Sequence, residues 1–117
     1  MKTFLLALPL LVLAAGPAHA TGGLACRTAG ADPIQVSLVI GHTAVASVVG
    51  ARLSHNGRDV AVKVAQSWLD PAEFRLDLTD PNALRHELRI RAKANGRYYD
   101  GSLWRHGKRR WVRCREA

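Results

Sequence analysis

Residues that could support catalysis or bind a metal are few and widely spaced along this chain of 117 residues. The histidines after residue 20 are His42, His55, His86 and His106, and none stands in a His-x-His, His-x3-His or Cys-x2-Cys spacing that is typical of zinc sites. The carboxylates are scattered, mostly beside turns, and no pair marks a general acid and base. The sequence contains no Gly-x-Ser-x-Gly, phosphate-loop or dinucleotide-binding motif. We therefore predict that the protein is not an enzyme and uses no metal or cofactor, with a hydrolase site assembled from distant strands as the weakest alternative.

Basic side chains are concentrated in the last third of the chain. Residues 21–84 carry five basic and six acidic side chains, a net charge of −1, whereas residues 85–117 carry eleven and three, a net charge of +8. Nine of those eleven are arginines, whose planar guanidinium group suits the recognition of carboxylates and phosphates. The aromatic residues Tyr98, Tyr99, Trp104 and Trp111 lie among them. This composition predicts a basic, aromatic surface.

The elements that position these residues show an alternation of apolar and polar side chains with a period of two. Residues 34–40, 60–64 and 74–78 follow this pattern. It is typical of strands that bury one face and expose the other. We therefore expect an all-β protein.

Residues 84–94 are the one segment that also resembles a helix, because Asp80-Pro81 precedes them like a helix start. Charged residues, however, occupy every odd position from 85 to 93. A helix would spread these charges around its circumference, so we predict a strand. In that strand Arg85 and the later arginines share one face. His86 lies on the apolar face, where we expect a hydrogen-bonded core side chain.

Turn signals separate the predicted strands. Asn56-Gly57 and Asn95-Gly96 are dipeptides typical of type I′ turns, in which both residues have positive φ. His106-Gly107, among others, marks a further corner. The predicted strands are residues 24–29, 34–40, 44–54, 59–68, 73–79, 84–94, 97–105 and 110–115. They predict one domain, residues 21–117: an eight-stranded antiparallel meander that closes as a small barrel or folds over as a sandwich.

The first twenty residues have the features of a secretory signal peptide. Lys2 supplies a positive charge, residues 4–15 are apolar, and Ala18-His19-Ala20 is a small-x-small cleavage site. A membrane anchor is the alternative, but it needs about 20 apolar residues to cross a bilayer. We therefore predict that residues 1–20 are removed and that the product, without a membrane span, is periplasmic or secreted.

The two cysteines, Cys26 and Cys114, lie near the two ends of the predicted domain. An oxidising compartment allows them to form a disulfide. The bond would close a loop of 89 residues (26 to 114 inclusive), which corresponds to roughly 4 to 5 kcal/mol of stabilisation in the chain-entropy model. The alternatives are free thiols or a redox pair, although a redox pair is expected as Cys-x-x-Cys. A disulfide would tie the first strand to the last, as closure of the sheet requires.

An anionic partner is the ligand that the basic, aromatic surface predicts. The candidate ligand-binding residues are Arg89, Arg91, Arg97, Tyr99, Trp104, Arg109 and Arg110. In this compartment we expect an anionic envelope component or a protein partner, bound with a steep dependence on salt, and no nucleic acid. The alternative is a structural envelope protein whose outward charges serve only solubility and the protection of sheet edges.

The stretch of residues 94–107 carries a family resemblance through Gly96, Tyr99, Trp104 and Gly107. Together with the cysteine placement, it resembles the small barrel proteins of bacterial envelopes that inhibit C-type lysozyme. Those proteins carry Ser-Gly-x-x-Tyr followed by a Trp and a Lys-Gly turn. In this chain Asn95 stands in place of the Ser and His106 in place of the Lys. The resemblance implies an eight-stranded barrel whose two loops enter the lysozyme cleft.

Overall fold

The computed structural model describes residues 22–41 and 47–117, and every regular element in these ranges is a β-strand. The predicted signal peptide, His42 and the start of the predicted strand 44–54 lie outside the described residues. The strands are β1 Gly22–Thr28, β2 Ile34–Gly41, β3 Ser47–His55, β4 Arg58–Val60, β5 Lys63–Leu69, β6 Glu73–Thr79, β7 His86–Asn95, β8 Tyr98–Arg105 and β9 Lys108–Glu116. The all-β prediction is confirmed.

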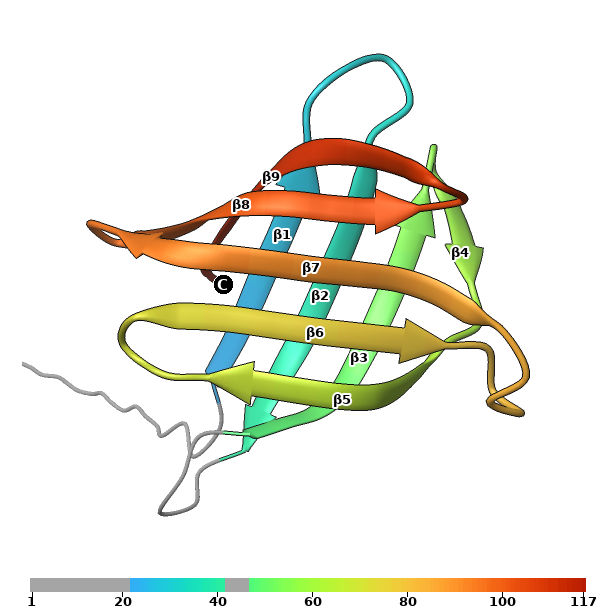
Figure 1. Ribbon diagram of the computed structural model, residues 1–117, viewed down its shortest axis with the longest axis horizontal. Coiled ribbons are helices and arrows are strands. Elements are labelled where there is room, and N and C mark those ends of the chain that lie inside the picture. Colours follow the sequence, from blue (N-terminus) through green and yellow to red (C-terminus); the bar gives the residue numbers. More distant parts are fainter. Residues whose placement is uncertain (1–21, 42–46) are drawn as a thin grey trace, which may run out of the picture.

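The nine strands form one antiparallel sheet in the order β4-β3-β2-β1-β9-β8-β7-β6-β5. The first and last strands, β1 and β9, are therefore neighbours at its centre. The sheet curls strongly, so that β5 to β8 cross in front of β1 to β3 (Figure 1). The predicted antiparallel meander is confirmed, and its form is a half-barrel.

One predicted strand, residues 59–68, consists of two strands in the structure. β4 pairs with β3, whereas β5 pairs with β6. Ala61 and Val62 lie between the two strands, so the chain leaves one side of the half-barrel there and joins the other. The described sheet therefore has nine strands rather than the predicted eight, and its two edge strands are consecutive in the chain.

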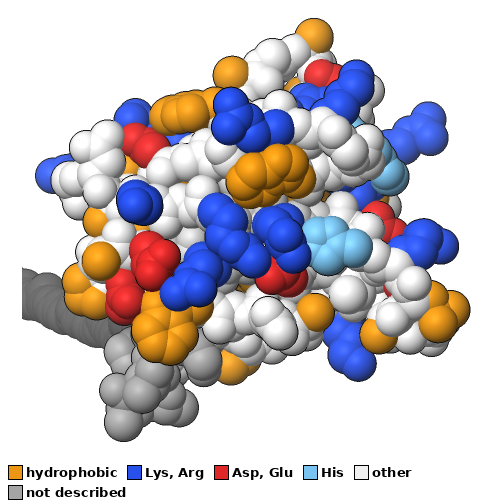
Figure 2. All heavy atoms as spheres, viewed as in Figure 1, with side chains coloured by type: hydrophobic (Ala, Val, Ile, Leu, Met, Phe, Trp, Pro, Cys, Tyr) orange, Lys and Arg blue, Asp and Glu red, His pale blue; other side chains and the backbone are white. Residues whose placement is uncertain are grey.

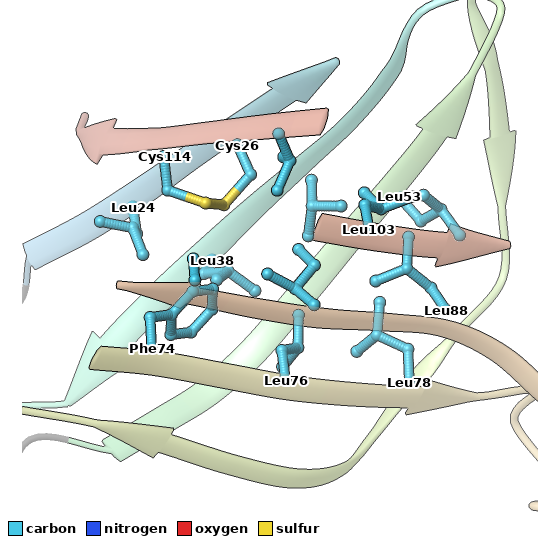
Figure 3. Packing of buried hydrophobic residues seen from close by; sticks show 14 of the residues in the cluster. Leu24, Cys26, Leu38, Leu53, Phe74, Leu76, Leu78, Leu88, Leu103 and Cys114 are labelled. Carbon is cyan, nitrogen blue, oxygen red and sulfur yellow. A yellow bond between two sulfur atoms is a disulfide. The ribbon is translucent and has the colours of Figure 1, made fainter. Parts of the chain in front are cut away.

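The concave side of the sheet holds the hydrophobic core. Alternate side chains of β6, namely Phe74, Leu76 and Leu78, are fully buried and belong to one cluster with Leu38 and Leu53 of β2 and β3 (Figure 3). Complete burial of one such side chain contributes about 1.5 to 3 kcal/mol. Because side chains alternate along a strand, the residues between them point to the convex, solvated side.

The predicted disulfide between Cys26 and Cys114 is present. The two residues lie directly opposite each other where β1 pairs with β9, and both are buried in the core cluster (Figure 3). The bond therefore joins the first and last strands, as expected from the sequence.

The predicted turn at His106-Gly107 is confirmed, and of the two predicted Asn-Gly turns one is correct and the other is shifted. Asn56 and Gly57 both have positive φ, 53° and 81°, as a type I′ turn requires. At the second site β7 continues through Asn95, so the turn consists of Gly96 and Arg97. Gly96 has a φ of 63°, which glycine adopts without strain. Arg97 therefore lies at the tip of the β7–β8 hairpin.

The predicted strand 84–94 begins later, at His86, and contains a bulge. Thr79 lies opposite His86 and Leu78 lies opposite Leu88, so Glu87 is an extra residue on β7. A bulge changes the alternation of side chains between the two faces. As a result Glu87 and Leu88 are both buried and His86 is exposed. The prediction of a core histidine at position 86 is therefore wrong.

Asp80 explains why β7 starts late. Its Oδ1 atom accepts hydrogen bonds from the backbone N–H groups of Leu84 and Arg85, at 2.7 and 2.5 Å. These bonds hold both residues in a loop and leave Leu84 81% exposed. Arg85 therefore does not project from the strand with the later arginines, contrary to the prediction.

Candidate functional site

The convex side of β6, β7, β8 and β9 carries cations around the indole ring of Trp104. Residues that pair across neighbouring strands form rows on this side: Arg89 lies opposite Asp77 on one side and Trp104 on the other, and Trp104 lies opposite Arg109. Figure 2 shows Lys and Arg side chains gathered over the middle of this side. We call the following residues the basic face: Arg75, Arg89, Arg91, Lys93, Trp104 and Arg109.

A hollow of about 400 Å³ lies within the basic face. It is lined by His86, Arg89, Arg91 and Trp104. His86 reaches this position because of the bulge in β7, which turns its side chain outward. The hollow therefore brings one imidazole and two guanidinium groups beside one indole ring.

Asp77 holds these nitrogen-bearing side chains in place. Its carboxylate accepts hydrogen bonds from Arg89 Nε at 2.8 Å and from Arg91 Nη2 at 3.0 Å, and His86 Nε2 lies 3.1 Å from Oδ1. Burial raises the pKa of Asp77, but the hydrogen bonds from Arg89, His86 and Arg91 outweigh it and lower the pKa below its usual value. One negative charge thus orients two guanidinium groups, and the hollow keeps a net positive charge.

Three of the predicted ligand-binding residues, Arg89, Arg91 and Trp104, line this hollow, and Arg109 lies beside it. Arg97 is exposed in the β7–β8 turn, at the far end of the hairpin. The structure thus brings four of the seven predicted residues together and separates a fifth from them.

The two remaining residues, Tyr99 and Arg110, do not share the basic face. The Tyr99 hydroxyl donates to the carbonyl oxygen of Asp70 at 2.6 Å, and its ring packs 6.2 Å from that of Phe74, centroid to centroid. Burial raises its pKa. Arg110 donates through Nη1 and Nη2 to both carboxylate oxygens of Asp32, at 3.2 and 3.0 Å. Both residues therefore have structural partners.

A second hollow, which sequence reasoning did not predict, lies where β9 pairs with β1. This groove has a volume of about 490 Å³ and includes Arg27, Tyr98, Trp111, Arg113 and Arg115 in its lining. The alternation of Trp111, Arg113 and Arg115 places them on one face of a strand and is visible in the sequence. Arg27, however, joins them only through the pairing of β1 with β9.

A cluster of ionisable groups lies on the buried side of the bulge. Arg105 Nη1 donates to Glu87 Oε1 at 2.8 Å, and the two side chains are 7% and 8% exposed. Burial raises the pKa of Glu87, but the hydrogen bonds from Arg105 and Arg85 outweigh this effect and hold the pKa below its usual value. Arg105 Nε also donates to His55 Nδ1 at 3.0 Å. These groups satisfy one another and stabilise that end of the half-barrel.

Within residues 22–41 and 47–117, no three His, Cys, Asp or Glu side chains are grouped closely enough to hold a metal ion. The same ranges contain no helix with the length and apolar character needed to cross a membrane. Comparison of the chain with protein-family models, with curated proteins and with solved structures finds no match.

The two turns that carry the resemblance to lysozyme inhibitors lie at opposite ends of β8. Gly96 precedes this strand and Gly107 follows it. The strand has eight residues, which corresponds to about 26 Å at 3.3 Å per residue. The two turns therefore do not converge on one end of the half-barrel.

Proposed function

We propose that the protein is an exported binding module that holds an anionic partner on its basic face. The observation that carries this proposal is the hollow in which Arg89 and Arg91 share one carboxylate beside Trp104. Each guanidinium group that pairs with Asp77 still has other N–H donors that can bind a ligand. The partner is an anionic envelope component or an acidic protein.

The fixed geometry of the hollow favours binding. Flexible arginine side chains lose rotational freedom when they bind a ligand, and this loss weakens affinity. Asp77 already restrains Arg89 and Arg91, so these side chains lose less rotational freedom when a ligand binds. The surrounding cations of the basic face add a positive potential that attracts an anion from solution.

The buried disulfide is compatible with an oxidising compartment outside the cytoplasm. There an anionic group on the envelope or on a protein is available to a soluble binding module. Because the cations of the basic face are largely exposed, salt is expected to weaken the interaction strongly.

Retention on immobilised dextran sulfate tests the proposal. Arg89→Gln combined with Arg109→Gln removes two cations from the basic face. Arg58→Gln combined with Lys63→Gln is the matched control, because it removes two exposed cations from the opposite edge strands, β4 and β5. We expect the first variant to elute at clearly lower salt than the control. Equal elution of the two variants would favour the alternative in which charge serves only solubility.

Inhibition of lysozyme, which the family resemblance implies, stays a separate prediction. A turbidity assay with C-type lysozyme and bacterial cell walls checks it directly. Clearing that slows as the protein is added would support an inhibitor, whereas unchanged clearing would leave the basic face as the candidate binding surface.

A further inference from the structure

The groove between β9 and β1 has the dimensions of a small-molecule site. Its volume of about 490 Å³ lies within the range of about 300 to 1,000 Å³ that such sites occupy. Part of its floor consists of the short side chains of Ala25 and Ser37, which pair across β1 and β2. The β8 and β9 residues Tyr98, Trp111 and Arg113 also line it. Figure 1 shows β9 beside the upper part of β1, with which it pairs.

Three planar groups form a shelf along this groove, made of Tyr98, Arg113 and Trp111. The Arg113 guanidinium carbon lies 4.2 Å from the centroid of the Tyr98 ring and 5.4 Å from that of Trp111. Asp100 fixes the guanidinium, because its Oδ1 and Oδ2 accept from Arg113 Nε and Nη2 at 2.8 and 2.9 Å. The shelf is accessible, since Trp111 is 57% exposed. It offers a rigid, largely apolar surface to a flat ring.

Two further cations, Arg27 and Arg115, lie beside the shelf. Arg27 is paired with Arg113 across the β1–β9 ladder, and Arg115 is paired with Ala25. Among residues 22–41 and 47–117, no carboxylate lies within salt-bridge distance of either cation. Like charges on directly opposed residues destabilise a sheet. An anion bound beside Arg27 would offset its repulsion from the opposed Arg113. Arg115, which lines the same groove, is a second cation that can contact this anion.

The strand pairing indicates which class of ligand fits. A peptide commonly binds a sheet by adding a strand to a free edge. Every strand that lines this groove is already paired on both sides: β1 with β2 and β9, β2 also with β3, and β8 with β7 and β9. A ligand must therefore be recognised by side chains alone, through the planar shelf, the two cations and the polar groups of Gln35 and Ser37.

We infer that this groove binds a short acidic saccharide. The C–H face of a sugar ring packs on the shelf, its carboxylate or phosphate pairs with Arg27 and Arg115, and its hydroxyls meet Ser37 and Gln35. The groove shares no lining residue with the hollow around Arg89, so this inference goes beyond the proposed function and does not rest on it.

Isothermal titration calorimetry of the full chain at low salt tests the inference. The probes are trigalacturonic acid, the neutral maltotriose and the acidic peptide hexaglutamate. We expect trigalacturonic acid to bind at least tenfold more tightly than either of the other two. Maltotriose cannot form the ion pairs because it is neutral, and hexaglutamate cannot stack on the shelf because it has no sugar ring. Failure of trigalacturonic acid to bind, or equal binding of hexaglutamate, would overturn the inference.

Variants place the ligand in the groove or elsewhere. Trp111→Ala is expected to weaken binding of trigalacturonic acid by roughly tenfold, as for removal of an aromatic anchor, and Arg115→Gln is expected to weaken it as well. Trp68→Ala is the matched control, because Trp68 on β5 is similarly exposed, at 51%, and lies outside the groove. Equal effects of Trp111→Ala and Trp68→Ala would contradict the assignment. Loss of binding only in Arg89→Gln would move the ligand to the hollow of the proposed function and overturn the inference about the groove.

Discussion

His55 and Arg105 meet at one end of the half-barrel, and their hydrogen bond determines where His55 can carry a proton. Arg105 Nε donates to His55 Nδ1, so this ring nitrogen acts as an acceptor and bears no hydrogen. Burial, together with the positive charges of Arg105 and Arg110, lowers the pKa of His55, although Asp32 opposes the shift. The folded protein therefore favours the neutral ring.

This environment predicts a loss of stability at mildly acidic pH. The unfolded chain binds a proton at His55 near the ordinary pKa of 6.5, whereas the folded chain binds it only at lower pH. The stabilisation is therefore fully present above pH 6.5 and is lost as the pH falls toward the lowered pKa of the folded state. We expect a smaller free energy of unfolding at about pH 5.5 than at about pH 7.5, measured by urea denaturation.

Two variants separate His55 from the other titrating groups. His55→Gln keeps an acceptor for Arg105 but cannot titrate, so the difference in stability between the two pH values is expected to shrink. His86→Asn is the control, because His86 is exposed and contacts Asp77 rather than His55. A pH dependence that is unchanged in His55→Gln would contradict the argument.

At the scale of the element, β7 illustrates what the sequence pattern can and cannot predict. The alternation of Leu88, Ile90 and Ala92 with charged residues correctly identified a strand and its buried face. It could not locate the bulge, because the bulge depends on how β7 aligns with β6 and on the loop that Asp80 holds. The pattern therefore assigned Glu87 and His86 to the wrong faces.

The pairing of β7 with β8 depends on Gly101. A Cβ atom at this position would lie 2.1 Å from the carbonyl oxygen of Arg91 and 2.6 Å from the Cα of Ala92. Gly101→Ala must therefore push the two strands apart. We expect it to lower the free energy of unfolding by about 1 to 3 kcal/mol, the usual cost of overpacking, as measured by urea denaturation.

Gly50→Ala is the matched control for this prediction. A Cβ atom at Gly50 of β3 would meet no atom within 4 Å, so this substitution should change stability by less than about 0.5 kcal/mol. Similar losses in the two variants would mean that close approach of the backbones does not constrain Gly101. Because Arg91 supplies the opposing carbonyl, Gly101→Ala should also weaken retention on dextran sulfate.

At the scale of the molecule, part of the candidate site was predictable from the alternation of side chains within strands. Trp104 and Tyr99 are five residues apart on β8, so they must point to opposite sides. Arg109 and Arg110 are adjacent on β9 and are separated in the same way. A set of ligand-binding residues chosen by charge and aromatic content alone mixes the two sides. The groove was not predictable, because its wall from β1 meets its wall from β9 only through the pairing of the first strand with the last.

The pairing of β1 with β9 also leads to the last prediction, which concerns the disulfide. Cys26 and Cys114 are 88 residues apart in sequence and are 2% and 0% exposed. The bond restricts almost the whole unfolded domain, so replacing both cysteines by serine should lower the free energy of unfolding by roughly 4 to 5 kcal/mol. That loss is comparable to the entire stability of many small domains.

Urea denaturation of the Cys26→Ser, Cys114→Ser double variant measures this loss, and the accessibility of the bond gives an independent check. Because both sulfur atoms lie in the core, a reductant must wait for the strands to open before it can attack. We therefore expect dithiothreitol to leave the bond intact in the native protein and to reduce it rapidly once urea unfolds the chain, as followed by thiol labelling and mass spectrometry. Rapid reduction without urea would show that the β1–β9 junction opens readily in the native protein. A double variant as stable as the parent would show that contacts other than the disulfide hold the half-barrel together.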